Sequence, residues 1–460
     1  MAETVAVALF TADLRLHDNP VVSGAVAAAD RVVPLFVVDP GIARAGFAVP
    51  NRAAFLADAL ADLDGSLRTR GGRLIVRRGD PAGEVAAVVR ETGARQVHLA
   101  GGVSRYASGR EERLRVALAG IGCALVVHDA VITAVPPGAV TPADRDHFAV
   151  FTPYYHRWNA ERIRPVTAAP RHVVLPDGAV AGALPSAAEL TGPGGGSPSP
   201  GLPRGGESEG RRRSAAWRRH GLADYPGLHD DLAADGTSRL SPYLHFGCLS
   251  AAELVRQARD RESGGEEFVR QLAWRDFHYQ VLAARPDAAR ADYRPRQYGW
   301  RSSPEEFAAW RDGRTGYPVV DAAMRQLRHE GWMHNRARLL TASFLTKTLC
   351  LDWRAGSRHF LDLLVDGDIA NNQLNWQWAA GTGTDTRPNR VLNPLRQAIR
   401  YDPEGAYVRR WVPELAGLAG RAVHQPWKLD AQERRRYDYP DPIITLAEGQ
   451  ARFARTRGLD

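Results

Sequence analysis

The sequence contains little cysteine and shows none of the usual arrangements of metal ligands. Its 460 residues include three cysteines, Cys123, Cys248 and Cys350, which are far apart and lack metal-ligand spacing. Isolated cysteines of this kind are typical of buried thiols in a reducing compartment, so we expect a cytoplasmic protein without disulfides, zinc or iron–sulfur clusters. The histidines form no HExxH or HxxE pattern, and we therefore predict no metal centre.

Long apolar stretches are missing as well. No window of the sequence approaches about 18 uninterrupted apolar residues, so no membrane-spanning helix and no membrane partner are expected. The first residues lack the charged and apolar regions of a signal peptide. No GxGxxG motif follows the first apolar run at 5–10, which argues against an ordinary dinucleotide site.

Lysine is scarce, although basic residues are plentiful. It occurs only at positions 347 and 428, so nearly all of the 60 basic side chains are arginines. Against 52 acidic residues they give a formal charge of +8, which favours a polyanionic partner, most economically nucleic acid. A chain of this length can also form two or three domains with sizeable cores.

Short apolar runs alternate with amphipathic segments in the first third of the chain. This alternation predicts a doubly wound parallel sheet with helices on both faces. Strands are predicted at 5–10, 32–38, 74–77, 96–100 and 124–128, and helices at 20–29, 52–70, 81–92 and 106–118.

The rest of the chain reads as a connector followed by helices. Residues 191–213 are so rich in Gly, Pro and Ser that a mobile loop or linker is predicted there. The sequence therefore predicts an α/β domain at 1–130, a connector at 131–213 and an all-α domain at 214–460. Helices of that last domain are predicted at 251–261, 266–284, 304–312, 319–330, 336–351 and 357–364.

Indole rings are interleaved with polar residues in the C-terminal half. The segments WMHNR at 332–336 and NNQLNWQWAAGTGTD at 371–385 combine hydrogen-bonding side chains with large aromatic ones in stretches that otherwise read as buried helix. That combination suits a planar, electron-accepting ligand buried in a helical bundle beside a surface that handles bases.

Together with four other segments, these motifs resemble the cryptochrome/photolyase family over nearly the whole chain. The other segments are LFTADLRLHDNP at 9–20, FAVFTPYYHRW at 148–158, TSRLSPYLHFG at 237–247 and TGYPVVDAAMRQL at 315–327. The resemblance implies an N-terminal antenna-binding domain and a C-terminal helical domain that holds one non-covalent FAD, active in its reduced form. It also implies a monomer that repairs cyclobutane pyrimidine dimers in damaged DNA with light.

Two groups of residues are candidates for holding FAD. Hydroxyl groups and free backbone N–H groups at 237–241 can cradle a phosphate, although an isolated turn of this kind can equally be a helix cap. By resemblance, Asn372 faces flavin N5, and Arg338 and Asp366 form an ion pair beside the ring. The acidic turn at 366–368 can otherwise be an ordinary solvated turn. The cofactor-binding candidates are Tyr225, Thr237, Ser238, Arg239, Leu240, Ser241, Arg338, Asp366, Gly367, Asp368 and Asn372.

Three indoles, Trp300, Trp353 and Trp376, match positions that relay an electron from the surface to the flavin in this family. Taken singly, each of them would be read as core packing.

A further set of residues is expected to face DNA. By resemblance, Trp274 and Trp378 form the walls of a cavity for a flipped-out pyrimidine pair, and stacking on them can repay part of the cost of flipping. Asn335 offers both a donor and an acceptor to a pyrimidine edge. Contacts to phosphate or to the rim of the cavity are expected from Arg275, Arg336, Arg396 and Gln397.

Two departures from the family pattern concern the residues expected to face DNA. Gln271 stands where most cyclobutane-dimer photolyases have a glutamate that hydrogen-bonds the dimer, and glutamine cannot supply a proton. His229 stands where an arginine near the DNA backbone is more usual, which predicts a slightly weaker salt-dependent affinity.

Alternative functions remain open at this point. A cryptochrome photoreceptor is one, favoured by Gln271 and opposed by the short segment that follows VHQPWKL at 423–429. A (6-4) photolyase is expected to have histidine at the place of Asn335, and a light-independent flavoprotein would leave the three indoles unused. A second, antenna chromophore is either a methenyl-folate or a deazaflavin, although Gly102 replaces the acidic residue expected for deazaflavin.

Overall fold

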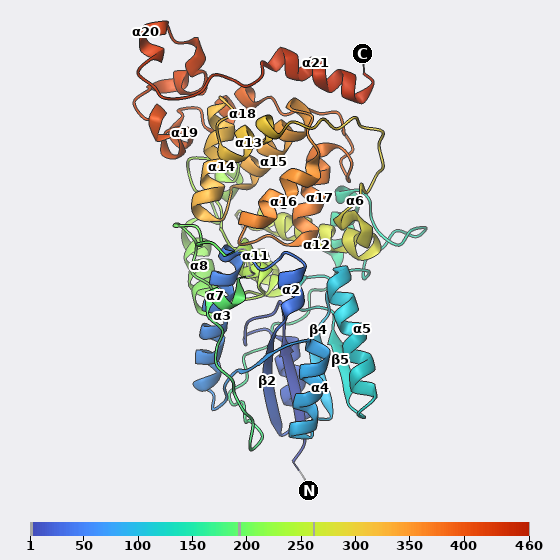
Figure 1. The fold of residues 1–460 in the computed structure, drawn as a ribbon. Helices are drawn as coiled ribbons and strands as arrows, with labels where there is room; N and C mark the ends of the chain where they lie inside the picture. The colour runs from blue at the N-terminus through green and yellow to red at the C-terminus, as the bar shows by residue number, and fades with distance from the viewer. Residues whose placement is uncertain (1–2, 192–194, 261–262, 460) are drawn as a thin grey trace. The chain divides into compact units, whose positions relative to one another are not determined.

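The computed structural model describes residues 3–191, 195–260 and 263–459 (Figure 1). Its internal contacts divide the chain into two compact units. Unit 1 comprises residues 1–198, 203–223 and 238–286, and unit 2 comprises residues 199–202, 224–237 and 287–460. Two short segments of the chain, 199–202 and 224–237, therefore leave the first unit and pack with the second.

Unit 1 contains a five-stranded parallel sheet with the strand order β3-β2-β1-β4-β5. The strand order reverses direction beside β1, which is the point where doubly wound sheets usually bind ligands. The strands are β1 (Val5–Phe10), β2 (Arg31–Val38), β3 (Ile75–Arg78), β4 (Gln96–Ala100) and β5 (Ala124–His128).

Helices pack on both faces of this sheet. Alternate side chains of the central strands form an apolar core with α4 (Pro81–Thr92) and α5 (Arg105–Ala119). On the other face, α1 (Pro20–Ala28) packs against β1 and β4. The neighbouring strands β1 and β4 are almost fully buried, as expected for a parallel sheet covered on two sides. The predicted doubly wound α/β fold is confirmed.

The remaining helices of unit 1 surround the sheet domain and extend it. The longest is α12 (Gly265–Ala284), which packs against α6 (Phe151–Ala160) and α11 (Ala251–Arg259). The others are α2 (Pro40–Arg44), α3 (Pro50–Arg68), α7 (Ala187–Leu190), α8 (Glu207–His220), α10 (Ser241–His245) and the 3-10 helix η1 (Pro286–Ala289), whose last three residues belong to unit 2.

Helix α8 corrects the loop predicted at 191–213, because it begins inside that range. The Glu207 carboxylate accepts hydrogen bonds from the backbone N–H groups of Leu16 and His17, at 2.7 and 3.1 Å, and so fixes the start of the helix. Gly210 lets the helix approach Tyr243, since a Cβ there would lie 2.8 Å from the ring. Residues 192–194 of the predicted loop lie outside the described residues.

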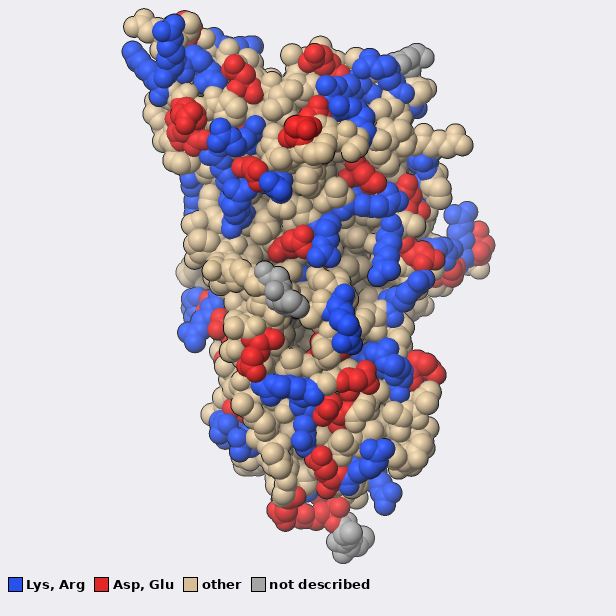
Figure 2. All heavy atoms as spheres, viewed as in Figure 1, with Lys and Arg blue, Asp and Glu red and all other residues tan. Residues whose placement is uncertain are grey.

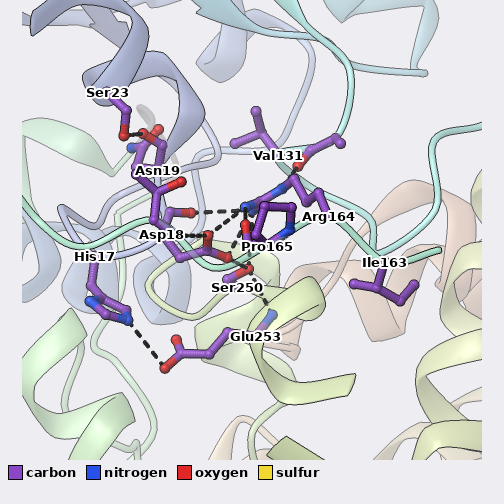
Figure 3. A network of polar contacts seen from close by, with 12 residues as sticks. His17, Asp18, Asn19, Ser23, Val131, Ile163, Arg164, Pro165, Ser250 and Glu253 are labelled. Atoms are coloured by element: carbon purple, nitrogen blue, oxygen red, sulfur yellow. Dashed lines mark hydrogen bonds and ion pairs between the residues drawn. The ribbon is translucent and has the colours of Figure 1, made fainter. Parts of the chain in front are cut away.

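The motif at 9–20 folds into a buried polar network (Figure 3). Asp18 is fully buried and accepts hydrogen bonds from Arg164, from the Ser250 hydroxyl and from the backbone N–H of Thr167. Arg15 donates to the backbone oxygens of Asp18, Val131 and Gly247. A buried carboxylate and a buried guanidinium are costly unless they are satisfied in this way. The motif therefore ties the first strand of unit 1 to segments far along the chain.

Unit 2 is helical, which confirms the predicted all-α part of the fold. Its core includes Trp310, Phe344, Trp353 and Trp376, all nearly inaccessible to solvent. Its α-helices are α9 (Tyr225–Leu228), α13 (Pro304–Asp312), α14 (Pro318–Glu330), α15 (Asn335–Ser343), α16 (Trp353–Leu363), α17 (Ile369–Ala380), α18 (Pro394–Tyr401), α19 (Ala406–Trp411), α20 (Ala431–Arg434) and α21 (Leu446–Arg457). Its short helical turns are η2 (Phe344–Thr348), η3 (Pro413–Leu415), η4 (Gly420–His424) and η5 (Pro426–Lys428).

The helix predicted at 336–351 is shorter than expected. Regular α-helix ends at Ser343, and η2 continues it as a π-helical turn. At Cys350 the backbone has a φ of 57°, which is unfavourable for a residue with a side chain and ends the helical path. Turns of π-helix are frequent at functional sites.

The motif at 315–327 anchors the last part of the chain. The Asp321 carboxylate accepts hydrogen bonds from Thr315, from the Gly316 N–H and from the Tyr439 hydroxyl, and Tyr317 donates to the backbone oxygen of Ile444. Burial raises the pKa of Asp321 to about 6. Among the described helices, none is long and apolar enough to cross a membrane.

Candidate functional site

In unit 1, the candidates for contact with DNA lie on helix α12. The indole of Trp274 stacks on the ring of Phe151, with centroids 3.7 Å apart and planes inclined by 7°. The guanidinium of Arg270 lies 5.1 Å from the Phe151 centroid. Gln271 is exposed on the same helix, three residues before Trp274, so its amide is accessible to a ligand. Trp274 is half-buried and is held in one orientation by its stacking partner.

Arg275, predicted to contact phosphate, is buried inside unit 1 instead. Its guanidinium donates to the backbone oxygens of Ile132 and Leu244 and lies 3.6 Å from the Asp276 carboxylate. Burial raises the pKa of Asp276 to about 6, and the charge of Arg275 opposes that rise. The predicted contact of Arg275 with phosphate stays a prediction, and in the structure its guanidinium joins α12 to Ile132 of the connector and to Leu244 of α10.

The segment predicted to grip a pyrophosphate is a tight turn. The Ser238 hydroxyl accepts a hydrogen bond of 3.4 Å from the Leu240 N–H, and Arg239 has a φ of 51°. Leu240 is buried, and the turn leads into the five-residue helix α10, which begins at Ser241. The Thr237 hydroxyl is buried and has no hydrogen-bond partner among the described residues. It is thus available to a ligand.

Upstream of this turn, Tyr225 is buried at the start of α9. Its ring lies 5.4 Å from that of His229, whose Nδ1 is 3.1 Å from the Tyr225 carbonyl oxygen. His229 itself is only half-buried. Local contacts therefore fix the position of both side chains.

In unit 2, Arg338 and Asp366 form the ion pair that the sequence predicts. The Arg338 Nη2 atom lies 2.8 Å from Asp366 Oδ2, and its Nε donates to the backbone oxygen of Met333. The other carboxylate oxygen, Oδ1, is buried and has no partner within the described parts of the chain. Leaving such an atom unpaired is costly, so it is a ready acceptor for a donor on a ligand.

Helix α17 begins directly after this carboxylate. Asp368 caps the helix, because its side chain accepts from the backbone N–H of Asn371 at 2.8 Å, and Gly367 is buried between the two aspartates. Asn372 is buried, and its side-chain amide donates to the backbone oxygen of Ser357 at 3.1 Å and to the side-chain oxygen of Gln373 at 3.0 Å. The carbonyl oxygen of the Asn372 side chain is then left to accept a hydrogen bond.

The three predicted relay indoles all belong to the core of unit 2. Trp376 and Trp353 are buried, whereas Trp300 is partly exposed at the edge of the cluster. Trp353 donates its indole N–H to Asp292 at 2.9 Å. A gradient from buried to partly exposed rings is what a relay between a buried acceptor and the surface requires.

Two neighbours of these indoles have no predicted role. Trp310 packs edge-to-face on Trp376 at 6.0 Å, and Arg457 lies 5.0 Å from the centroid of Trp300. Burial lowers the pKa of Arg457 to about 10. Neither residue stands within the motifs that carry the family resemblance, so sequence reasoning had no signal for them.

The DNA candidates of unit 2 surround Trp378. This indole is half-buried, and the guanidinium of Arg390 lies 4.9 Å from its ring centroid. Asn335 is exposed at the first position of α15. Arg336 pairs with both oxygens of Asp230, at 2.7 and 2.6 Å, and lies over the ring of Tyr401. Arg390 is the residue of this group that the sequence analysis missed.

Helix α18 carries the last two candidates. Arg396 is exposed in the first turn, and Gln397 is half-buried beside it. The Gln397 side-chain oxygen is inaccessible to solvent and unpaired within the described residues. On the face shown in Figure 2, basic side chains are interspersed with acidic ones.

The residues of unit 2 fit a flavin. An unpaired buried carboxylate oxygen, a buried amide with a remaining acceptor and a nearby guanidinium match the polar edge of an isoalloxazine ring, which has both donors and acceptors. The indoles Trp353 and Trp376 belong to the core of the same unit and would supply the apolar and oxidisable side chains that such a ring uses.

Comparisons with known proteins agree with this geometry. Residues 268–457 match the family described as the FAD binding domain of DNA photolyase, and residues 6–171 match the family described as DNA photolyase. The chain is 63% identical to the deoxyribodipyrimidine photo-lyase of Streptomyces griseus, over 99% of this chain and 100% of that protein.

Solved structures give the same result. A cryptochrome from Synechocystis superposes with a TM-score of 0.90 at 29% identity, over 98% of this chain and 99% of that one. An archaeal photolyase from Sulfolobus tokodaii, described as having two FAD molecules with the implication of a novel light-harvesting cofactor, superposes with a TM-score of 0.86 at 30% identity. That match covers 99% of this chain and 100% of that one.

Proposed function

The chain belongs to the cryptochrome/photolyase family, and on this basis we propose that it is a deoxyribodipyrimidine photo-lyase, which repairs cyclobutane pyrimidine dimers in DNA with light. The observation that carries the proposal is the 63% identity over full length to a protein of that name. We further propose that it acts as a monomer in the cytoplasm and that residues 214–460 form the catalytic domain.

FAD is the cofactor, and Asp366, Arg338 and Asn372 would hold its ring. The unpaired Asp366 oxygen would accept from a ring donor, while the Arg338 charge balances the carboxylate. The segment at 237–241 would bind the pyrophosphate, with the buried Thr237 hydroxyl as one donor. Bound FAD in its reduced form supplies, on excitation by blue or near-UV light, the electron that splits a dimer.

The role of the chain in repair is to position the lesion. Trp274 and Trp378 would stack against the flipped-out pyrimidines and return about 1–3 kcal/mol per base, which offsets a flipping cost of a few kcal/mol. Asn335 and Gln271 are exposed and would hydrogen-bond the pyrimidine edges. Arg390, Arg396 and Gln397 would contact the backbone, which positions the duplex without reading its sequence. The splitting itself needs no acid–base pair.

Trp376, Trp353 and Trp300 would restore the reduced cofactor after adventitious oxidation. Buried Trp376 would give up an electron first, and partly exposed Trp300 would exchange it with a reductant in solvent. This path serves to activate the protein and is not part of the repair cycle.

A blue-light photoreceptor is the second candidate. It is favoured by Gln271 and by the similarity to a protein described as a cryptochrome. Illumination of a thymine-dimer oligonucleotide in the presence of the photoreduced protein separates the two functions, because a photoreceptor without repair activity would leave the dimer intact.

A second chromophore would bind in unit 1, at the carboxyl edge of the sheet. Asp39 follows β2 there, and the Tyr106 hydroxyl donates a hydrogen bond to its carboxylate. Burial, together with this carboxylate, raises the pKa of Tyr106 to about 12. The site lies beside the reversal of strand order, the usual ligand position in such sheets, and either a methenyl-folate or a deazaflavin would occupy it.

A further inference from the structure

Lys347, one of the two lysines, is almost completely buried in the π-helical turn η2. Its Nζ atom donates a hydrogen bond of 2.8 Å to the backbone oxygen of Arg390. The other lysine, Lys428, is exposed. Burying an amine in an apolar core is costly, so the hydrogen bond that Lys347 makes there indicates its role.

The Arg390 carbonyl belongs to the loop that follows α17, residues 381–393. A second hydrogen bond ties the same part of this loop to α15, because the Leu392 N–H donates to the Ser343 hydroxyl at 3.1 Å. The two tethers hold the loop on either side of residue 391, whose side chain is 40% exposed. The backbone on both sides of this exposed residue is therefore attached to the core of unit 2.

The side chain of Arg390 extends from this tethered backbone to Trp378. Its guanidinium lies 4.9 Å from the indole centroid, while Arg390 as a whole is exposed. Within the described residues, no salt bridge to a carboxylate is formed by Arg390. The charge is thus presented at the surface, in a direction fixed by the ring below it and the tether behind it.

The local charges around Lys347 do not explain its burial. The Asp385 carboxylate favours the charged amine, but Arg457 and Arg390 disfavour it, and burial lowers the pKa of Lys347 to about 7. A methionine could fill the same space without this cost. The feature that a methionine could not supply is the hydrogen bond to the Arg390 carbonyl.

We propose that Lys347 is a positioning residue for the lesion pocket: by holding the Arg390 carbonyl, it keeps the Arg390 guanidinium over Trp378, where it binds a phosphate beside the flipped-out dimer. The inference rests on the proposed function, which makes Trp378 a wall of that pocket. Ser343 shares this role through its bond to Leu392.

Equilibrium binding to an oligonucleotide with one thymine dimer tests the proposal. Lys347→Met and Ser343→Ala should each weaken binding, Lys347→Met by about tenfold, since a hydrogen bond and the cation–π contact that depends on it are lost together. Lys428→Met, the matched control, should bind like the wild type. Because Lys347 acts through Arg390, the double variant Lys347→Met/Arg390→Gln should bind no more weakly than Arg390→Gln alone.

Additive losses in the double variant, or wild-type affinity in Lys347→Met, would overturn the proposal. Restoration of most of the lost affinity by Lys347→Arg, which can still donate to the carbonyl, would support it. If Lys347 has a merely structural role, Lys347→Met should have a lower melting temperature. Its effect on DNA binding should then be the same whether or not Arg390 is present.

Limited proteolysis examines the tether without any DNA. Because Pro388 follows Arg387, trypsin can cut the loop only after Arg390. Cleavage there should be several-fold faster in Lys347→Met than in the wild type or in Lys428→Met, because local opening becomes easier. Unchanged cleavage would refute the tether. If trypsin cuts the wild type more slowly than Lys347→Met but the wild type does not bind the dimer, the tether is supported and the proposed function is contradicted.

Discussion

The indole of Trp274 lies parallel to the phenyl ring of Phe151, with centroids 3.7 Å apart, and so presents one fixed aromatic face. Phe151 comes from α6 and Trp274 from α12, and both helices belong to unit 1. If Trp274 stacks on a flipped-out base, as we propose, Phe151 fixes the orientation of the ring that the base meets.

Phe151→Leu should weaken binding of dimer-containing DNA by about threefold to tenfold, because stacked aromatic pairs contribute about 0.5–1.5 kcal/mol beyond burial. Flavin content should not change. Titration of a fluorescent dimer oligonucleotide measures the effect, with Phe307→Leu in unit 2 as the control. An unaltered dissociation constant in a normally folded variant would show that Phe151 does not position Trp274.

Asp366→Asn should lose most of its bound FAD during purification. The change removes the charge that pairs with Arg338, and a charge-assisted hydrogen bond in a buried site contributes about 1.5–3 kcal/mol. Flavin released on denaturation gives the stoichiometry. Asp362→Asn is the matched control, since Asp362 pairs with Arg358 at a more exposed place on α16. Full flavin occupancy in Asp366→Asn would rule out the proposed role of this carboxylate.

Trp376→Phe should slow photoreduction of the flavin by about tenfold or more, since phenylalanine is much harder to oxidise than an indole. Repair by the chemically reduced protein should remain, because the relay lies outside the repair cycle. Trp310→Phe is the control, because it alters the edge-to-face neighbour of Trp376 but not the relay. Equal loss of photoreduction in both variants would mean that packing, and not the relay, was damaged.

Lys347 should make stability depend on pH above neutrality. Its pKa is about 7 in the folded protein, against 10.5 for an ordinary lysine, so between these values only the unfolded chain holds the proton. In this range unfolding must therefore take up a proton from solvent, which becomes less favourable as the pH rises, and the free energy of unfolding increases by about 1.4 kcal/mol per pH unit. Below about pH 7 this contribution is constant.

Urea unfolding at several pH values measures this dependence. Lys347→Met should lose the rise, whereas Lys428→Met should keep it. Labelled lysine gives a direct check, because the chain contains two lysines and their signals can be titrated separately. Parallel stability curves for the wild type and Lys347→Met would contradict the lowered pKa.

The sheet could be predicted because its strands are buried on both faces. The continuous apolar run at 5–10 and the short run at 96–100 both fit a buried strand, and the structure places β1 and β4 at the same residues. Helices with clear caps were predicted almost as closely, among them α4, which begins after the Asp80 cap and ends at Gly93.

The errors arose where tertiary contacts decide the local structure. Helix α8 starts inside a Gly/Pro-rich run because Glu207 is held by backbone N–H groups from residues 16 and 17, which are remote in sequence. Arg275 was expected to contact phosphate or the rim of the cavity, yet its guanidinium is buried and donates to the backbone oxygens of Ile132 and Leu244, which are remote in sequence. Arg390 lies in a loop without periodicity, so only the structure connects it with Trp378.

Gln271→Glu should increase the yield of repair. A carboxyl group can share a proton with the dimer, whereas the glutamine amide cannot. Its exposed position on α12 tolerates the change without loss of stability. Comparison of repair per absorbed photon in the two proteins measures this effect. A lower yield in the variant would show that the pocket is adapted to glutamine.

The central claim is tested most directly by repair itself. An oligonucleotide with one thymine cyclobutane dimer is mixed with the photoreduced protein and exposed to blue light, beside a dark control, and the intact thymines are quantified. Our account predicts light-dependent recovery of both thymines in the wild type and none in the dark. A protein that binds FAD and is photoreduced, but leaves the dimer intact in both the wild type and Gln271→Glu, would contradict it and favour a photoreceptor.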